Sequence, residues 1–480
     1  MATANAASES KKWILNAFSM SSPTHVAPGL WRHPRNQTHR YKEIGYWIEL
    51  AKLLDGNFHA LFIADMLGIY DVYNGPGNIR EVLPGAAQFP ISDPSLPIAA
   101  MASVTKSLSF GITASTTYES PFLLARRYST LDHLTNGRVA WNVVTSYLES
   151  AAKNLGLEQE VSHDERYEIA DEFLDVVYKL LEGSWRDDAV ILDHDLKSYT
   201  HPDRVRRIDH KGKYFKVAGP HLIEPSRQRT PFIFQAGASK AGKAFATRHA
   251  EAMFLPGMHI ESVRKNVEDV RQTAREQGRN LSGLKLIAGM LVIVDETDER
   301  AQQKYDDYLS YADLDGSLAL FGGWTGADLG KYADDDDFEF NGPGAIQSIV
   351  SSWRTTIPGS EGIKWTKKRV AQELALGGPH PRAIGSAKTV ADILQTWVSV
   401  TGIDGFNISY AVGPGDLEDV VKYLIPELQA RGVFWDPIEA EGRTTRENYL
   451  GTHFSKEGRL SSDHPGARYR WAASETSDSK

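Results

Sequence analysis

Short apolar runs alternate with longer amphipathic stretches along most of this 480-residue chain. Eight of the runs are rich in β-branched and aromatic residues and short enough to be strands buried on both faces. They lie at 13–18, 60–65, 108–117, 138–146, 231–237, 251–255, 284–294 and 405–410. Amphipathic stretches follow them, as at 167–181, where apolar residues recur every three or four positions. The alternation predicts a parallel α/β fold.

Long polar segments follow the first, second, fourth and seventh runs. Residues 21–40 and 70–94 are broken by Pro and Gly and predict long loops. The pattern over residues 185–229 predicts an extended segment with a hairpin. That over residues 299–382 predicts an insertion built of helices. No Gly-x-Gly-x-x-Gly follows the first run, which disfavours a dinucleotide-binding open sheet. We therefore predict a (β/α)₈ TIM-like barrel with several insertion segments.

The domain organisation follows from where this pattern begins and ends. We expect a disordered tail over residues 1–10, one barrel domain over 11–440 with the insertion at about 299–382, and a C-terminal extension over 441–480. The first ten residues lack the apolar stretch of a signal peptide. No apolar run approaches the roughly 18 residues of a membrane span. We expect a cytoplasmic protein that does not bind a membrane.

Composition and missing motifs narrow the chemistry. A net charge of −9, with no Lys/Arg-rich run, disfavours a nucleic-acid partner. The absence of cysteine excludes disulfides, thiolate metal sites and Cys nucleophiles. No two histidines have the spacing of a helical metal site, so we predict no metal. No Gly-x-Ser-x-Gly nucleophile elbow or Walker-type loop is present either.

Polar residues at the carboxyl ends of barrel strands should gather around one mouth. They are Ser22, His25, Asp65, Thr113, Asn142, Ser146, His163, Tyr167 and Ser239. The Gly-containing turn at 235–239 leads into a helix and suits a phosphate, although Ser239 could serve only as the helix cap. His163 and Tyr167 share one face of a first helical turn, which fits either ligand binding or simple capping and packing. A largely uncharged barrel mouth with a phosphate-binding turn suits an organic cofactor.

Six longer motifs occur in order, at 29–34, 115–118, 141–146, 163–167, 235–237 and 403–407. Together they resemble the flavin-dependent monooxygenases of the bacterial-luciferase-like superfamily, over nearly the whole chain. The likeness is to the branch with the nitrilotriacetate and dibenzothiophene-sulfone monooxygenases, and within it to the long-chain alkane monooxygenases. Several long motifs in one order are very unlikely to agree by chance.

This resemblance implies a cofactor and a site. FMN would bind as FMNH₂, supplied by a separate NAD(P)H-dependent flavin reductase, and O₂ would act through a C4a-peroxyflavin on a small-molecule substrate. By the family pattern the flavin contacts fall on Asp65, Thr113, His163, Tyr167 and Ser239. The substrate side falls on Ser22, His25, Tyr70, Gln88 and Tyr147. Relatives suggest a homodimer or homotetramer.

The substrate stays open at this point. A long-chain alkane is one candidate; a sulfone, an aminopolycarboxylate, or flavin binding without oxygenase activity are alternatives. The chain departs from the alkane monooxygenase pattern, with Ser22 for Cys, and Tyr147 and Leu320 for His. A buried Tyr147 hydroxyl needs a hydrogen-bond partner that a hydrocarbon cannot offer. This predicts a shortened hydrocarbon cavity or a polar group on the substrate, unless the protein supplies an acceptor.

Overall fold

The computed structural model describes residues 11–237, 239–338, 347, 350–351, 353–354 and 362–471. The predicted tail at 1–10 lies outside these residues, as do residues 472–480 and part of the predicted insertion. Within the described part of the chain, no helix is long and apolar enough to cross a membrane.

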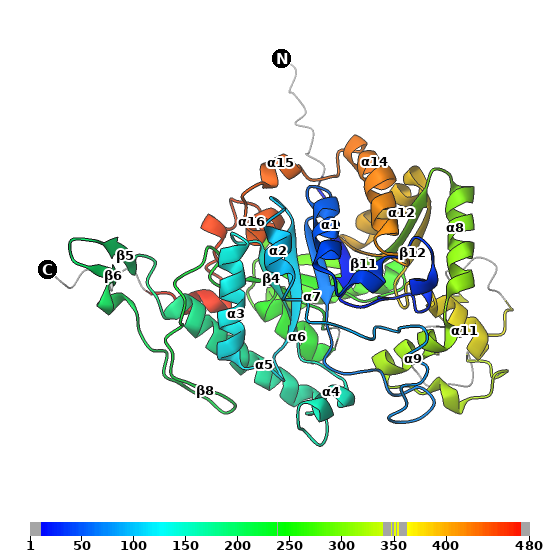
Figure 1. The fold of residues 1–480 in the computed structure, drawn as a ribbon, viewed down its shortest axis with the longest axis horizontal. Helices are drawn as coiled ribbons and strands as arrows, with labels where there is room; N and C mark the ends of the chain where they lie inside the picture. Colours follow the sequence, from blue (N-terminus) through cyan, green and yellow to red (C-terminus); the bar gives the residue numbers. More distant parts are fainter. Residues whose placement is uncertain are drawn as a thin grey trace, which may run out of the picture.

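Eight parallel strands close into a barrel, which confirms the predicted fold (Figure 1). They are β1 (Ile14–Met20), β2 (Ala60–Ala64), β3 (Ser109–Ser115), β4 (Val139–Val144), β9 (Phe232–Gln235), β10 (Ala252–Leu255), β11 (Lys285–Asp295) and β13 (Gly405–Ser409). Each pairs with the next in this order, and β13 pairs with β1 to complete the ring. All eight correspond to the apolar runs of the sequence, because parallel strands covered on both faces must be apolar throughout.

Helices surround the barrel, and their buried faces pack against the strands. They are α1 (Ile44–Leu54), α2 (Ile98–Ala102), α3 (Pro121–Leu134), α5 (His163–Tyr178), α6 (Lys240–His249), α7 (Ile260–Glu276), α12 (Ala387–Thr401), α13 (Gly415–Asp419) and α14 (Ile425–Ala430). The indole of Trp141 on β4 shows the packing: its ring lies 5.8 Å from that of Tyr128 on α3 and 5.9 Å from that of Phe173 on α5, centroid to centroid.

The segments between these units carry further elements. Helix α4 (Glu149–Asn154) follows β4, and the polar passage after α5 forms two small hairpins, β5 (Val190–Asp193) with β6 (Ser198–Thr200) and β7 (His210–Lys211) with β8 (Lys216–Val217). The second hairpin lies where the sequence predicted one. The β5–β6 hairpin extends away from the barrel, on the side opposite α8 (Asp298–Tyr311) (Figure 1).

The predicted insertion begins with α8 and continues with α9 (Leu314–Thr325) and α11 (Lys367–Leu374). Buried residues of α9 and α11 form an apolar cluster with Tyr70 and Tyr73 from the loop after β2. A ninth parallel strand, β12 (Arg382–Ser386), pairs with the second half of β11 and was not predicted. Its five residues, Arg-Ala-Ile-Gly-Ser, are too short and mixed to show a strand pattern.

The C-terminal extension packs against the amino ends of the strands. It contains α16 (Thr445–Leu450), and α15 (Pro437–Ala440) lies just before it, at the end of the predicted barrel domain. Tyr449 and Leu450 join an apolar cluster with residues that begin strands, among them Ile14 and Phe232, and the Tyr449 hydroxyl donates to Asn16 Oδ1 at 2.5 Å. Arg446 is fully buried and pairs with Glu251 at 2.6 Å. The extension therefore closes the barrel at one end, which leaves the carboxyl ends for the site.

Candidate active site

Two adjacent cavities lie at the carboxyl ends of the strands, with volumes of about 330 and 390 Å³. Asp65, Met66, Val144, Tyr147 and Ala236 line both cavities, so the two lie side by side. The first also contacts the start of α5 and the turn before α6. The second reaches over the barrel toward β1 and α9. Cavities of this size and position are typical of cofactor sites in barrel enzymes.

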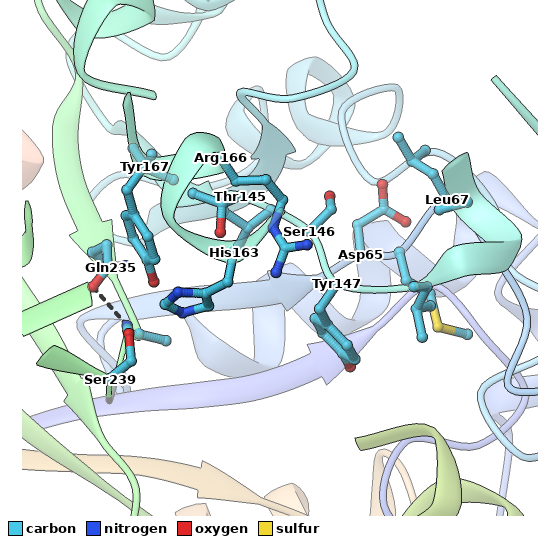
Figure 2. Close-up of a pocket in the computed structure, with 17 residues that line it drawn as sticks. Asp65, Leu67, Thr145, Ser146, Tyr147, His163, Arg166, Tyr167, Gln235 and Ser239 are labelled. Atoms are coloured by element: carbon cyan, nitrogen blue, oxygen red, sulfur yellow. Dashed lines mark hydrogen bonds between the residues drawn. The ribbon is translucent and has the colours of Figure 1, made fainter. Parts of the chain in front are cut away.

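The first turn of α5 supplies three side chains to the first cavity. The rings of His163 and Tyr167 lie 5.3 Å apart, centroid to centroid, which confirms that they share one face of the helix. Figure 2 shows Arg166 pointing into the space between these residues and Tyr147. Its guanidinium donates to Glu160 and to the carbonyl of Val161, while its buried Nε has no partner among the described residues. Arg166 therefore brings a guanidinium to this end of the cavity, with its charge paired to Glu160.

Two glycines bring the turn before α6 against Tyr167. A Cβ on Gly242 would lie 2.7 Å from the Tyr167 hydroxyl oxygen and 2.8 Å from Gly237 Cα. Ser239 is the N-cap of α6: its Oγ accepts from the Gly242 amide at 3.0 Å. Accepting that bond leaves the hydroxyl proton free to donate. Ser239 can thus cap the helix and bind an anion at once, so the two interpretations of the sequence do not exclude each other.

The second cavity is lined mainly by apolar and aromatic side chains, with amide and hydroxyl groups on its floor. Thr113 Oγ1 donates to the carbonyl of Ile63 at 2.9 Å and accepts from Asn142 Nδ2 at 2.9 Å. This arrangement leaves Asn142 Oδ1 buried and without a partner among the described residues. A buried acceptor without a partner costs about 1–3 kcal/mol, and a donor from a bound ligand would remove this cost.

Asp65 lies between the two cavities, directly after β2. Burial raises the pKa of its carboxyl to about 7, opposed by a hydrogen bond from the Met66 backbone and assisted by the charges of Asp93 and Glu119. A carboxyl with such a pKa changes charge near neutral pH, as groups at functional sites often do.

Tyr147 has a hydrogen-bond partner within the protein. Its hydroxyl lies 3.1 Å from that of Tyr70, which donates to Gln88 Oε1 at 3.0 Å. The protein therefore supplies a partner for the Tyr147 hydroxyl, and the side chain is 47% exposed, so the prediction of a buried Tyr147 is wrong. Together with His25, these three residues line the second cavity.

Two residues singled out from the sequence lie elsewhere. Ser22 is buried and is not among the described residues that line either cavity. Leu320 is buried in the apolar cluster of α9 and lines neither cavity. Of the positions that depart from the alkane monooxygenase pattern, only Tyr147 lies directly on the cavities.

The backbone is strained at two cavity positions. Gln88 has φ +56° and Ser146 has φ +59°, in the left-handed region that costs a non-glycine residue roughly 1–2 kcal/mol. Hydrogen bonds hold both: Gln88 Nε2 donates to the carbonyl of His25 at 2.9 Å, and Ser146 Oγ donates to Ser115 Oγ at 2.9 Å. Strain of this kind clusters at functional sites, where it fixes side chains in position.

The sequence also left site residues unassigned. Arg166 lies within the 163–167 motif, and its place in the first turn beside His163 and Tyr167 could have indicated it. Trp324 and His380 line the second cavity from within the predicted insertion, where no local pattern marks them. Their role depends on how the insertion folds back over the barrel.

Comparisons with known proteins agree with this geometry. The model of the luciferase-like monooxygenase family matches residues 24–404. The chain is 46% identical to the dimethyl-sulfide monooxygenase of Hyphomicrobium sulfonivorans, over 96% of this chain and 94% of that protein. It is 47% identical to the long-chain alkane monooxygenase of Geobacillus thermodenitrificans (strain NG80-2), over 96% and 98% of the two chains.

Solved structures show the same relationship. The crystal structure of DmoA from Hyphomicrobium sulfonivorans superposes with a TM-score of 0.90 at 44% identity, covering 98% of this chain and 99% of that one. That of riboflavin lyase (RcaE), with modified FMN and riboflavin, gives 0.85 at 32% identity and covers 96% and 100%. The barrel, the adjacent cavities and these matches all agree. They show that the chain belongs to the luciferase-like monooxygenase family.

Proposed function

We propose that the protein is the oxygenase component of a two-component, FMNH₂-dependent monooxygenase. Its reaction would be FMNH₂ + O₂ + substrate → FMN + oxygenated substrate + H₂O. One oxygen atom enters the substrate, the other leaves as water, and reduced flavin supplies both electrons. A separate NAD(P)H-dependent reductase would deliver the reduced flavin as a transient partner.

The adjacent positions of the two cavities carry this proposal. In Figure 2, Ser239, Tyr167 and His163 lie at one end of the first cavity and Asp65 at the other. The first end combines a helix N-terminus, a free hydroxyl proton and the Arg166 guanidinium, which together suit the FMN phosphate. The apolar second cavity suits the flavin ring, whose N–H groups can satisfy the unpartnered Asn142 Oδ1.

Each part of the chain then has a role toward the flavin. Ser239, Tyr167, His163 and Arg166 would hold the phosphate end, while Thr113 and Asp65 would contact the ring. Bound reduced flavin supplies the activation of O₂. The protein's own contribution is to exclude water from the cavity and to orient the substrate.

The open second cavity distinguishes this proposal from the alternative of a flavin-binding protein without oxygenase activity. Side chains of the chain itself would fill the substrate space in such a protein. Here two cavities of about 330 and 390 Å³ are open, and the second adjoins a polar group of Tyr70, Gln88 and Tyr147. The space supports binding of a substrate as well as a cofactor.

Flavin titration of Ser239→Asp tests the assignment of the phosphate end. A second negative charge there should weaken FMN binding by at least tenfold, since a charge-assisted hydrogen bond of about 1.5–3 kcal/mol is replaced by repulsion. Riboflavin, which lacks the phosphate, should bind wild type and variant equally. Unchanged FMN affinity in the variant would refute the assignment. Oxygen consumption with an added FMN reductase and NADH then tests the reaction itself.

A further inference from the structure

A third cavity lies away from the barrel mouth, between the segment that follows α5 and the C-terminal extension. Its volume is about 420 Å³, larger than either cavity at the carboxyl ends of the strands. None of the described residues that line it lines those two cavities. Helix α5 and the π-helical turn that continues it (Lys179–Gly183) run from the first cavity to the third. From Arg166 to Glu182 this is about 25 Å, at about 1.5 Å per residue.

Arginines outnumber carboxylates around the third cavity. The residues that line it, and the partners of their ion pairs, include five arginines and four acids. Two of the acids, Asp187 and Asp188, each pair with two arginines. Arg470 pairs with the buried Glu182 at 2.9 Å, and the fourth acid, Glu457, is exposed to solvent. The group thus has a formal charge of +1. Its arginines are Arg186, Arg204, Arg229, Arg459 and Arg470.

Two of these guanidinium groups keep N–H donors that no described residue accepts. Arg459 bonds only through Nη2, to Asp187 Oδ1 at 2.9 Å, an oxygen that already accepts from Arg229 Nη2 at 2.6 Å. Arg470 bonds through Nε to Glu182 and through Nη2 to the carbonyl of Leu460. Nε and Nη1 of Arg459 and Nη1 of Arg470 are therefore available to a ligand. None of the three is buried away from the cavity and solvent.

The electrostatic surroundings of Arg459 favour an incoming anion. Burial lowers the pKa of its guanidinium, the charge of Arg229 lowers it further, and that of Arg470 adds to the effect, against Asp187 and Glu182. An anion beside Arg459 would oppose this shift, because it supplies the negative charge that the shared Asp187 does not. Guanidinium groups bind phosphate oxygens through paired, charge-assisted hydrogen bonds.

Two indoles also line the third cavity. Trp185 Nε1 donates to the carbonyl of His221 at 2.9 Å, and Trp471 Nε1 donates to the carbonyl of Gly183 at 2.8 Å. Both indole N–H groups are thus already bonded, and the indoles offer apolar ring surface to a ligand. A phosphate ion alone would fill only a small part of 420 Å³, whereas the size is typical of a site for a small organic molecule.

We propose that the third cavity is a second ligand site, separate from the barrel mouth, which binds a small organic phosphate of mononucleotide size. Arg459 and Arg470 bind the phosphate group, and Trp185 and Trp471 contact the ring of the ligand. This inference does not depend on the proposed monooxygenase function, because no residue of the third cavity belongs to the flavin site.

Isothermal titration calorimetry of the full-length, flavin-free protein tests the site, with AMP, adenosine and inorganic phosphate as probes. AMP should bind at least tenfold more tightly than adenosine, which lacks the phosphate, and more tightly than inorganic phosphate, which lacks the ring. No AMP binding at millimolar concentration would overturn the inference. Adenosine or inorganic phosphate binding as tightly as AMP would overturn it as well.

Arg459→Gln identifies the cavity that binds the probe. The variant removes the unpaired charge and leaves the pair of Arg229 with Asp187 in place, so we expect it to fold. AMP affinity should fall at least tenfold, the loss of one charge-assisted hydrogen bond. Arg468→Gln is the matched control: Arg468 lies in the same segment, pairs with Asp175 at 2.8 Å and does not line the cavity. Its AMP affinity should stay within about twofold of wild type.

Two more variants complete the test. Ser462 is exposed and lines the third cavity, so Ser462→Glu adds a negative charge there without disturbing the core, and it should also weaken AMP binding at least tenfold. This variant decides the matter if Arg459→Gln does not fold. Ser239→Asp at the barrel mouth should leave the same binding event unchanged. AMP binding that is lost in Ser239→Asp and kept in Arg459→Gln and Ser462→Glu would place AMP at the barrel mouth and overturn the inference.

Discussion

The packing of Gly242 against Tyr167 gives a sharp test of the flavin site. In Gly242→Ala the added methyl would lie 2.7 Å from the Tyr167 hydroxyl oxygen and 2.8 Å from Gly237 Cα. Neither distance is tolerable, and Gly237 Cα is backbone, so the turn and the ring must separate. Overpacking of this kind costs about 1–3 kcal/mol. Alanine regains at most about 1 kcal/mol of helix propensity, so we expect the free energy of unfolding to fall by up to roughly 2 kcal/mol.

The larger effect should fall on FMN. If Tyr167 moves, its hydroxyl no longer reaches the phosphate, and a charge-assisted hydrogen bond of about 1.5–3 kcal/mol is lost. This corresponds to a roughly ten- to hundredfold weaker affinity. Quenching of flavin fluorescence measures the affinity, and urea unfolding of the flavin-free protein measures stability separately.

Gly45→Ala is the matched control. Gly45 also lies in the first turn of a helix, but a Cβ there would meet nothing closer than 3.9 Å. This variant should be as stable as wild type or slightly more so, with unchanged FMN affinity. If Gly242→Ala binds FMN as tightly as Gly45→Ala, the close approach of Tyr167 does not serve the phosphate, and our account of this end is wrong.

Three further variants address charge and stability. Burial raises the pKa of the Asp65 carboxyl to about 7 from an ordinary 3.8. Between about pH 4 and 7 the folded state therefore holds a proton that the unfolded state releases, so the free energy of unfolding falls as the pH rises. Asp65→Asn should remove this loss and stabilise the flavin-free protein by about 2–4 kcal/mol at pH 8 but not at pH 4, as measured by urea unfolding. Arg166→Met should weaken FMN binding at least tenfold and leave riboflavin binding unchanged; equal losses for both would place Arg166 away from the phosphate. Arg446→Met leaves Glu251 buried without its cation and should cost about 3–5 kcal/mol of stability, with FMN affinity intact. If Arg446→Met lowers the free energy of unfolding by less than about 1 kcal/mol, as for an exposed ion pair, the extension does not stabilise this end of the barrel.

The sequence by itself determined the barrel and the residues that meet at the His163 end of the first cavity. The eight buried strands are apolar runs, and strands covered on both faces can be recognised locally because every position must be apolar. His163, Tyr167 and Ser239 begin helices, and a helix start is also a local signal, set by residues a few positions apart. The carboxyl ends of parallel strands meet at one rim, so these local signals were enough to bring the residues together.

Only the tertiary structure decided the lining of the second cavity. The Tyr70 hydroxyl contacts Gln88, Tyr147 and the Trp324 indole, and Tyr70 and Trp324 are 254 positions apart in the chain. A hydrogen bond between a loop and a distant helix leaves no periodic pattern in the sequence, because the local conformation of neither partner requires it. Ser22 and Leu320, chosen by comparison with a family pattern, proved to lie off the cavities for the same reason. Which side chains of a long loop face a cavity is fixed by packing against other segments, as by Gly323 against Tyr70, and local sequence does not encode that contact.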